Sequence, residues 1–196
     1  MEKFIVRNAG ATDLRFVERI VEEIYHASQQ KGTGIAVRSN EYISSKILEG
    51  KAIIAVTEDS RWAGFCYIES WGHNKFVANS GLIVAKEFRG HGLAKAIKEK
   101  AMHLSFILFP GAKLFGLTTS LSVMKINSDL GYRPVTFSEL TDDNEFWKGC
   151  ESCPYYDILV RTKRTHCLCT GMIKSPEKKD GEQEAGKIKA NQIIIE

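Results

Sequence analysis

The sequence lacks the features that would place this protein in a membrane or on nucleic acid. No apolar run approaches the ~18–20 residues that a membrane-spanning helix needs. The N-terminus, MEKFIVRN, has an acidic second residue and no apolar core, so it is unlike a secretory signal. The net charge is only +3, because 27 Lys and Arg are scattered among 24 Asp and Glu. We therefore expect a cytoplasmic protein with neither a membrane nor a nucleic-acid partner.

Cysteine is scarce, and its number is odd. The five are Cys66, Cys150, Cys153, Cys167 and Cys169. Without a secretory signal they are expected to be reduced thiols. The last four form a C-x2-C and a C-x-C pair, which also suits a structural zinc ion. The stretch YYDILVRTK between the pairs predicts a strand rising ~3.3 Å per residue, which would hold them too far apart. We therefore predict no metal, and zinc remains the alternative if that strand bends sharply.

What is present is typical of one soluble domain with a tail, since 43% of the 196 residues are hydrophobic and 26% are charged. Periodicity predicts a strand at 3–7, helices at 13–30 and 41–48, and a three-stranded meander from 51 to 85. We place the domain at residues 1–172. Residues 173–196 are predicted to form a disordered tail, because positions 174–192 are highly charged and nearly free of large apolar side chains. The final IIIE could add to a sheet edge, but we expect it to have no structural role.

A long helix follows the meander. Its apolar face is Leu93, Ile97, Ala101, Leu104 and Leu108. Lys95, Lys98 and Glu99 fall off that face. Because this helix separates GLIVA from the next strand, KLFGLTT, the two strands are predicted to be parallel neighbours. A short helix to 130 and two closing strands, YRPVTF at the sheet edge and YYDILVRTK, complete an α/β fold with a mixed sheet.

The stretch EFRGHGLAK, where the long helix begins, is unusual because no acid occurs from Phe88 to Lys98. Helix N-termini carry unpaired amides and a partial positive charge, which acidic side chains normally exploit. Gly90 and Gly92 remove the Cβ atoms that would keep an anion from those amides, and Arg89 adds a cation. The sequence therefore predicts a diphosphate site at this helix start.

Two common phosphate motifs do not match this stretch. A Walker loop requires G-x4-G-K-[ST], and that spacing is absent. A Rossmann fingerprint requires a third glycine where Lys95 stands, and an acid ~20 residues further on; no acid occurs between Glu99 and Asp129.

The stretch resembles the signature of the GCN5-related N-acetyltransferases, [QR]-x-x-G-x-[GA], through Arg89, Gly92 and Ala94. The resemblance extends to the order of elements over residues 3–164. It implies the GNAT acyl-CoA N-acyltransferase fold, a central splayed mixed sheet with helices on both faces. It also implies acetyl-CoA or another acyl-CoA, such as succinyl-CoA, as cosubstrate, and a homodimer as one assembly state.

The resemblance assigns CoA contacts to this chain. Leu82, Ile83 and Val84 would follow the pantetheine through main-chain groups, with the Val84 amide as oxyanion donor. The pyrophosphate would be bound by the amides of Arg89, Gly90, His91, Gly92, Leu93 and Ala94. The imidazole of His91 is expected to face solvent.

The implied reaction moves the acyl group to a primary amine, which requires a base and an acid. The family's frequent tyrosine, four residues before the late Gly-aromatic pair, is Asn127 here. Asn127, Tyr132 and Ser120 are therefore the candidate substitutes. Glu69 is the candidate base, with an exposed strand-end carboxylate as its alternative interpretation.

The acceptor would lie against the loop at 31–40, where Arg38 suits an acceptor carboxylate. A weaker resemblance to amino-acid N-acyltransferases of the N-acetylglutamate synthase type suggests the α-amino group of an amino acid such as glutamate. The alternatives are a protein or polyamine amine, or a catalytically silent CoA-binding module.

Overall fold

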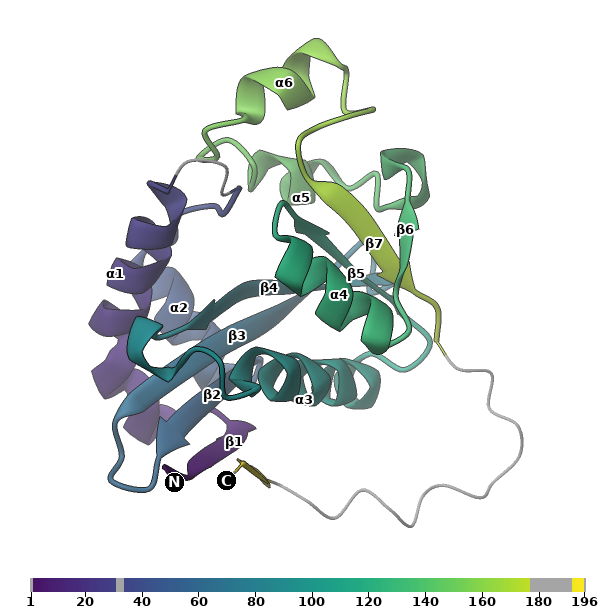
Figure 1. The fold of residues 1–196 in the computed structure, drawn as a ribbon. Coiled ribbons are helices and arrows are strands. Elements are labelled where there is room, and N and C mark those ends of the chain that lie inside the picture. Colours follow the sequence, from purple (N-terminus) through teal and green to yellow (C-terminus); the bar gives the residue numbers. More distant parts are fainter. Residues whose placement is uncertain (1, 31–33, 177–191, 196) are drawn as a thin grey trace, which may run out of the picture.

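The computed structural model describes residues 2–30, 34–176 and 192–195. The described chain forms one eight-stranded sheet in the order β6-β7-β5-β4-β3-β2-β1-β8 (Figure 1). The strands are β1 Phe4–Asn8, β2 Ala52–Thr57, β3 Trp62–Trp71, β4 Phe76–Val84, β5 Lys113–Thr118, β6 Arg133–Val135, β7 Thr170–Lys174 and β8 Gln192–Ile195. Among these described strands, only β4 and β5 pair in parallel. The mixed α/β sheet and this parallel pair confirm the fold class and the connection predicted from the sequence.

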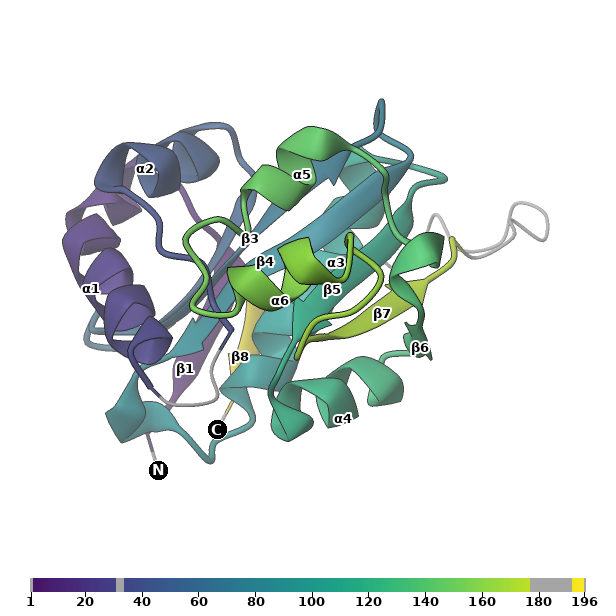
Figure 2. The same ribbon diagram turned by 90° about the horizontal axis from the view of Figure 1, so that it is seen from above.

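Helices cover both faces of the sheet (Figures 1 and 2). On one face lie α1 Val17–Ser28, preceded by the 3₁₀ turn η1 Ala11–Phe16, and α2 Asn40–Leu48; on the other lie α3 Leu93–Leu108 and α4 Leu121–Asp129. The short helices α5 Asn144–Lys148 and α6 Tyr156–Arg161 pack near β5 and β7, with 3₁₀ turns η2 Lys86–Phe88 and η3 Phe137–Glu139 between elements. Within the described residues, no helix combines the length and apolarity needed to cross a bilayer.

The two parallel strands separate after a short paired stretch. They pair only where Phe76, Val77 and Ala78 face residues 113–115. Beyond that point β4 bulges, because its pairing with β3 skips from Tyr67↔Ser80 to Phe65↔Ile83. Gly81 sits in this bulge with φ 64°, and a Cβ there would lie 2.6 Å from the Tyr67 ring. The gap between β4 and β5 is the splay that the family resemblance implied.

The stretch YYDILVRTK was predicted as the last strand, and this is wrong. Residues 156–161 form α6, in which Leu159 is buried and Val160 is 56% exposed. A run with one inward-facing apolar residue suits a short surface helix better than a strand buried on both sides. This helix packs on a second apolar cluster, which is formed by Ala78, Phe115, Phe137, Leu140, Trp147, Leu159 and Ile173. The strand that pairs antiparallel with β5 is β7, which begins at Thr170.

The expected boundary at 172/173 also needs correction, because β7 runs across it to Lys174. The last residues were expected to have no structural role, whereas β8 pairs antiparallel with β1. Ile193 and Ile195 pack against the main core, so the pairing covers an edge that β1 would otherwise leave open. Most of the predicted disordered tail, residues 177–191, lies outside the described residues.

Candidate functional site

The start of α3 presents unpaired amides to solvent. Gly90 and Gly92 have φ of 90° and 77°, and a Cβ built at either one meets nothing within 4 Å. Gly92 is the N-cap, and the first turn contains no acid. In the described chain, the amides of residues 90–94 donate to no backbone or side-chain acceptor. This arrangement fits an anion bound by main-chain donors.

The side chains around this helix start point away from the amides. The Arg89 Nε donates to the Val84 carbonyl at 3.2 Å, which ties the loop to the end of β4. The His91 side chain is exposed, and its ring lies 5.4 Å from the Phe4 ring. The imidazole thus faces solvent at the edge of the site, as the sequence predicted.

A cavity of about 420 Å³ extends through the gap between β4 and β5. Its walls come from both faces of the sheet: Glu69 and Tyr67 face α2, whereas Lys98 and Asn127 belong to α3 and α4. Four of the predicted site residues line it, namely Arg38, Glu69, Leu82 and Asn127. The other predicted CoA contacts, Ile83, Val84 and residues 89–94, lie outside its lining, toward the start of α3.

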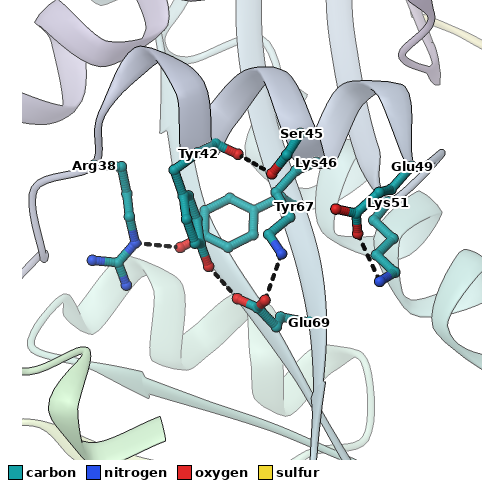
Figure 3. Close-up of polar contacts among 8 residues, drawn as sticks. All are labelled: Arg38, Tyr42, Ser45, Lys46, Glu49, Lys51, Tyr67 and Glu69. Carbon is teal, nitrogen blue, oxygen red and sulfur yellow. Dashed lines mark hydrogen bonds and ion pairs between the residues drawn. The ribbon is translucent and has the colours of Figure 1, made fainter. Parts of the chain in front are cut away.

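On the α2 face, three polar side chains hold Glu69 and Arg38 in place (Figure 3). The Lys46 Nζ donates to Glu69 Oε1 at 2.5 Å, and the Tyr42 hydroxyl donates to Glu69 Oε2. The Arg38 Nε donates to the Tyr67 hydroxyl at 3.0 Å. The Glu69 side chain is 19% exposed, so the alternative of an exposed strand-end carboxylate is wrong.

The electrostatics of this network keep its members in defined protonation states. Burial raises the pKa of Tyr42, and neighbouring Tyr67 and Glu69 raise it further, so the phenol remains a neutral donor. Burial would lower the pKa of Arg38, but Tyr67 and Tyr42 outweigh it and hold this pKa above its usual value. The Arg38 Nη1 donates to the Val37 carbonyl at 3.0 Å. Within the described residues Nη2 makes no hydrogen bond, so it remains a donor for a ligand.

Sequence reasoning missed Tyr42, Lys46 and Tyr67. Tyr67 and Glu69 lie two residues apart on β3, hence on one face of the sheet. Tyr42 and Lys46 are four apart on α2, hence on one face of that helix. Both periodicities are visible in the sequence, but neither indicates that the two faces meet.

On the opposite face of the sheet, the three candidates for the general acid have different surroundings. Asn127 is 1% exposed, and its Oδ1 is buried without a hydrogen-bond partner. Tyr132 is also buried, but it does not line the cavity, and its hydroxyl donates to Asn79 Oδ1 at 2.7 Å. Burial raises the pKa of Tyr132. This tyrosine is a core side chain, while Ser120 caps α4 by accepting from the Val123 amide.

Lys98 was expected to lie off the buried face of its helix, and this is wrong. It is 2% exposed, whereas Leu108, expected on the buried face, is 43% exposed. The reason is that α3 contacts both the sheet and α4, so a wider arc of the helix is covered than one apolar stripe.

The four late cysteines line one wall of the cavity together. The argument that a straight strand separates them therefore fails, because α6 brings the two pairs to the same side. Among the residues that the structure describes, no group of three or more His, Cys, Asp or Glu is arranged to hold a metal ion. Burial raises the pKa of Cys150 to about 11 and that of Cys169 to about 12, so these thiols are uncharged at neutral pH.

Several solved structures share this fold at low sequence identity. N-acetylglutamate synthase from Neisseria gonorrhoeae, complexed with coenzyme A and N-acetyl-glutamate, has a TM-score of 0.64 and 13% identity; the match covers 89% of this chain and 35% of that one. This chain thus spans about a third of that enzyme. Rv2747 from Mycobacterium tuberculosis, in complex with CoA, has a TM-score of 0.63 and 16% identity over 88% and 99% of the chains.

A phosphinothricin acetyltransferase from Sinorhizobium meliloti, in complex with AcCoA, is similarly related, with a TM-score of 0.59 and 17% identity over 92% of this chain and 93% of that one. Comparison of the sequence with curated proteins finds no significant match. The model of the acetyltransferase (GNAT) family matches residues 17–122, more than half of the chain. This match includes the glycine loop, the splayed strands and α3, and the chain belongs to the acetyltransferase (GNAT) family as an acyl-CoA-dependent acyltransferase.

Proposed function

We propose that this enzyme transfers an acyl group from acyl-CoA to the α-amino group of an amino acid such as glutamate. The observation that carries the proposal is the cavity in the β4–β5 gap, which is lined by side chains from both faces of the sheet. On one face the bare helix start fits a diphosphate. On the other, Arg38 offers a free guanidinium nitrogen.

The donor is proposed to enter along the main chain. Its pyrophosphate binds the amides of residues 90–94, and its pantetheine follows the edge of β4 that β5 leaves unpaired, past Leu82, Ile83 and Val84. The Val84 amide donates to the oxyanion of the tetrahedral intermediate. The thioester carbon then lies in the gap, within reach of an acceptor on the opposite face.

The acceptor is proposed to bind with its carboxylate at Arg38 and its amine toward Glu69. An Arg-carboxylate pair is strong and directional, so it would fix the amine relative to the gap. Glu69, held by the Lys46 ammonium and the Tyr42 hydroxyl, can take the proton that the attacking amine must lose. Trp71 and Phe146, whose rings lie 5.7 Å apart, wall the same part of the cavity.

A polyamine or a protein lysine as acceptor is the alternative within the same reaction class. A polycationic acceptor needs several free carboxylates in its pocket. Glu69 is already paired with Lys46, and Arg38 would repel a second cation. These charges favour an amino-acid acceptor over a polyamine. A CoA-binding module without activity is the further alternative, and it rests only on the missing tyrosine.

Release of free CoA thiol tests the proposal. The enzyme is incubated with acetyl-CoA or succinyl-CoA and each of the twenty amino acids, with spermidine as the polyamine. We expect release with one acyl donor and a small group of amino acids that includes glutamate. The matched control is 4-aminobutyrate, which keeps the amine and distal carboxylate of glutamate but lacks the α-carboxylate that Arg38 is proposed to bind. Release with spermidine alone would favour the polyamine alternative, and no release with any acceptor would favour the silent module.

A further inference from the structure

Lys98 is a buried cation without an acidic partner. It is 2% exposed, its Nζ lies 5.4 Å from the centre of the Tyr132 ring, and a Cβ at Gly116 would lie 3.9 Å from that Nζ. In the described chain, no carboxylate forms an ion pair with it. An ammonium group removed from water without a partner is costly, and Met would fill the same space without that cost. The position therefore suits an anion that arrives with a ligand.

The location of Lys98 restricts which anion this is. Lys98 lies six residues after Gly92, about 9 Å along the helix axis. The amides at the start of α3 are therefore proposed to bind the pyrophosphate without a contribution from Lys98. The acceptor carboxylate is proposed to bind Arg38, on the opposite face of the sheet. The remaining candidate for the anion at Lys98 is the negative charge that develops in the β4–β5 gap during the reaction. Lys98 lines the cavity there together with Asn127, whose Oδ1 is buried and unpaired.

We propose that Lys98 is the general acid that protonates the CoA sulfur as the thioester breaks. This inference rests on the proposed function. The neutral amine attacks the thioester carbon and forms the C–N bond, and the oxyanion then collapses and breaks the C–S bond. The electron pair passes to sulfur, which takes a proton from the Lys98 ammonium. The acceptor nitrogen loses its proton to Glu69 or solvent, and solvent reprotonates Lys98, so the products are an amide and the free CoA thiol.

The surroundings of Lys98 suit this role. Burial lowers the pKa of Lys98 from its ordinary value, and the neighbouring Cys66 thiol opposes this only in part. The lowered pKa makes the ammonium a stronger acid, which favours proton transfer to the departing sulfur. The titratable groups facing it are Cys66 of β3 and Tyr132 after α4, both with raised pKa values and hence uncharged at neutral pH. Both are weaker acids than an ammonium whose pKa is lowered, so Lys98 is the proton donor of this part of the cavity.

The test is Lys98→Met, with kcat, KM and the Kd for acyl-CoA measured for acetyl-CoA and succinyl-CoA. We expect kcat to fall ~10²-fold with both donors, a typical loss for a missing general acid, while the Kd for acyl-CoA stays within about threefold. In the wild type kcat should fall at alkaline pH as Lys98 loses its proton, and this limb should be absent from the variant. Removal of a buried charge should also raise the Tm, so the variant remains folded.

Three results would overturn the role of Lys98. An unchanged kcat would make the lysine structural. A loss confined to succinyl-CoA would assign it to the carboxylate of the acyl chain instead. An alkaline limb that persists in Lys98→Met would show that another group titrates. The control is Lys100→Met on the same helix, outside the lining of the cavity. Absence of acyl-CoA binding by the wild type would instead refute the proposed function, so the two failures are distinguishable.

Discussion

The donor side and the acceptor side of the proposed site are built from different parts of the polypeptide. On the donor side, the main chain supplies the contacts: glycines with positive φ, unpaired amides at a helix start, and a strand edge without a partner. On the acceptor side, the contacts come from side chains that α2, β3 and the loop before α2 bring together. A CoA diphosphate and pantetheine are common to every acyl-CoA, whereas the acceptor is the variable substrate.

This difference indicates which substitutions would alter ligand binding on each side. Main-chain donors persist through most substitutions, since every residue except proline has an amide, and only a Cβ or a charge in the wrong place blocks them. A side-chain network changes its ligand when one member changes. The donor side should therefore be sensitive at its glycines, and the acceptor side at Arg38 and Glu69.

The largest expected effect is that of Gly92→Glu, which tests the main-chain side. The substitution forces a side chain into a left-handed conformation with φ 77° and places a carboxylate at the amides proposed to bind the diphosphate. We expect the Kd for CoA, measured by calorimetry, to rise by more than ~10²-fold, the order expected when a repelled charge replaces several charge-assisted hydrogen bonds.

Gly111→Glu is the matched control for that substitution. Gly111 has φ 87° and open space around its Cβ position, so it takes the same backbone strain in a turn that does not line the cavity. We expect a similar loss of stability but an unchanged Kd for CoA. If the two variants bind CoA equally well, the diphosphate does not bind at the start of α3.

The fold and the geometry of the helix start were predictable because their signals are local. The glycine spacing at 90 and 92, the absence of acids in the first turn, and the apolar stripe of α3 all occur within twenty residues of one another. Ser120 and Gly131 likewise mark the ends of α4 in the sequence. The local pattern was misleading at residues 156–161, where it predicted a strand. The segment forms a helix that packs against the second apolar cluster.

The acceptor side was only partly predictable because its partners are distant in sequence. Arg38 and Glu69 were identified by charge and position. However, the Arg38–Tyr67 and Lys46–Glu69 contacts join residues 29 and 23 positions apart. Lys98 could not be found from periodicity, since a lysine beside an apolar stripe normally extends to solvent. Its burial follows from α4 packing against α3, a contact that no local pattern encodes.

The second prediction addresses the acceptor side through Arg38→Met. The substitution keeps an unbranched apolar stem but removes the guanidinium nitrogen proposed to bind the acceptor carboxylate. Loss of a charged hydrogen bond is worth about 2 kcal/mol, so the KM for the amino acid should rise roughly 30-fold. The Kd for acyl-CoA should not change, because Arg38 lies on the opposite face of the sheet. A changed Kd for acyl-CoA with an unchanged KM for the amino acid would contradict this division.

The smallest expected effect tests whether Glu69 takes a proton or only positions Tyr42 and Lys46. Glu69→Gln keeps the shape of the side chain but cannot take a proton, so kcat/KM should fall at least ~tenfold with CoA binding intact. Tyr42→Phe is the matched control: it removes one donor to Glu69 and leaves the carboxylate paired with Lys46. We expect that control to lower kcat/KM less than ~threefold, since one hydrogen bond to a charge is lost while the base remains. Equal losses in both variants would mean that Glu69 only positions Tyr42 and Lys46, and that the amine delivers its proton directly to solvent.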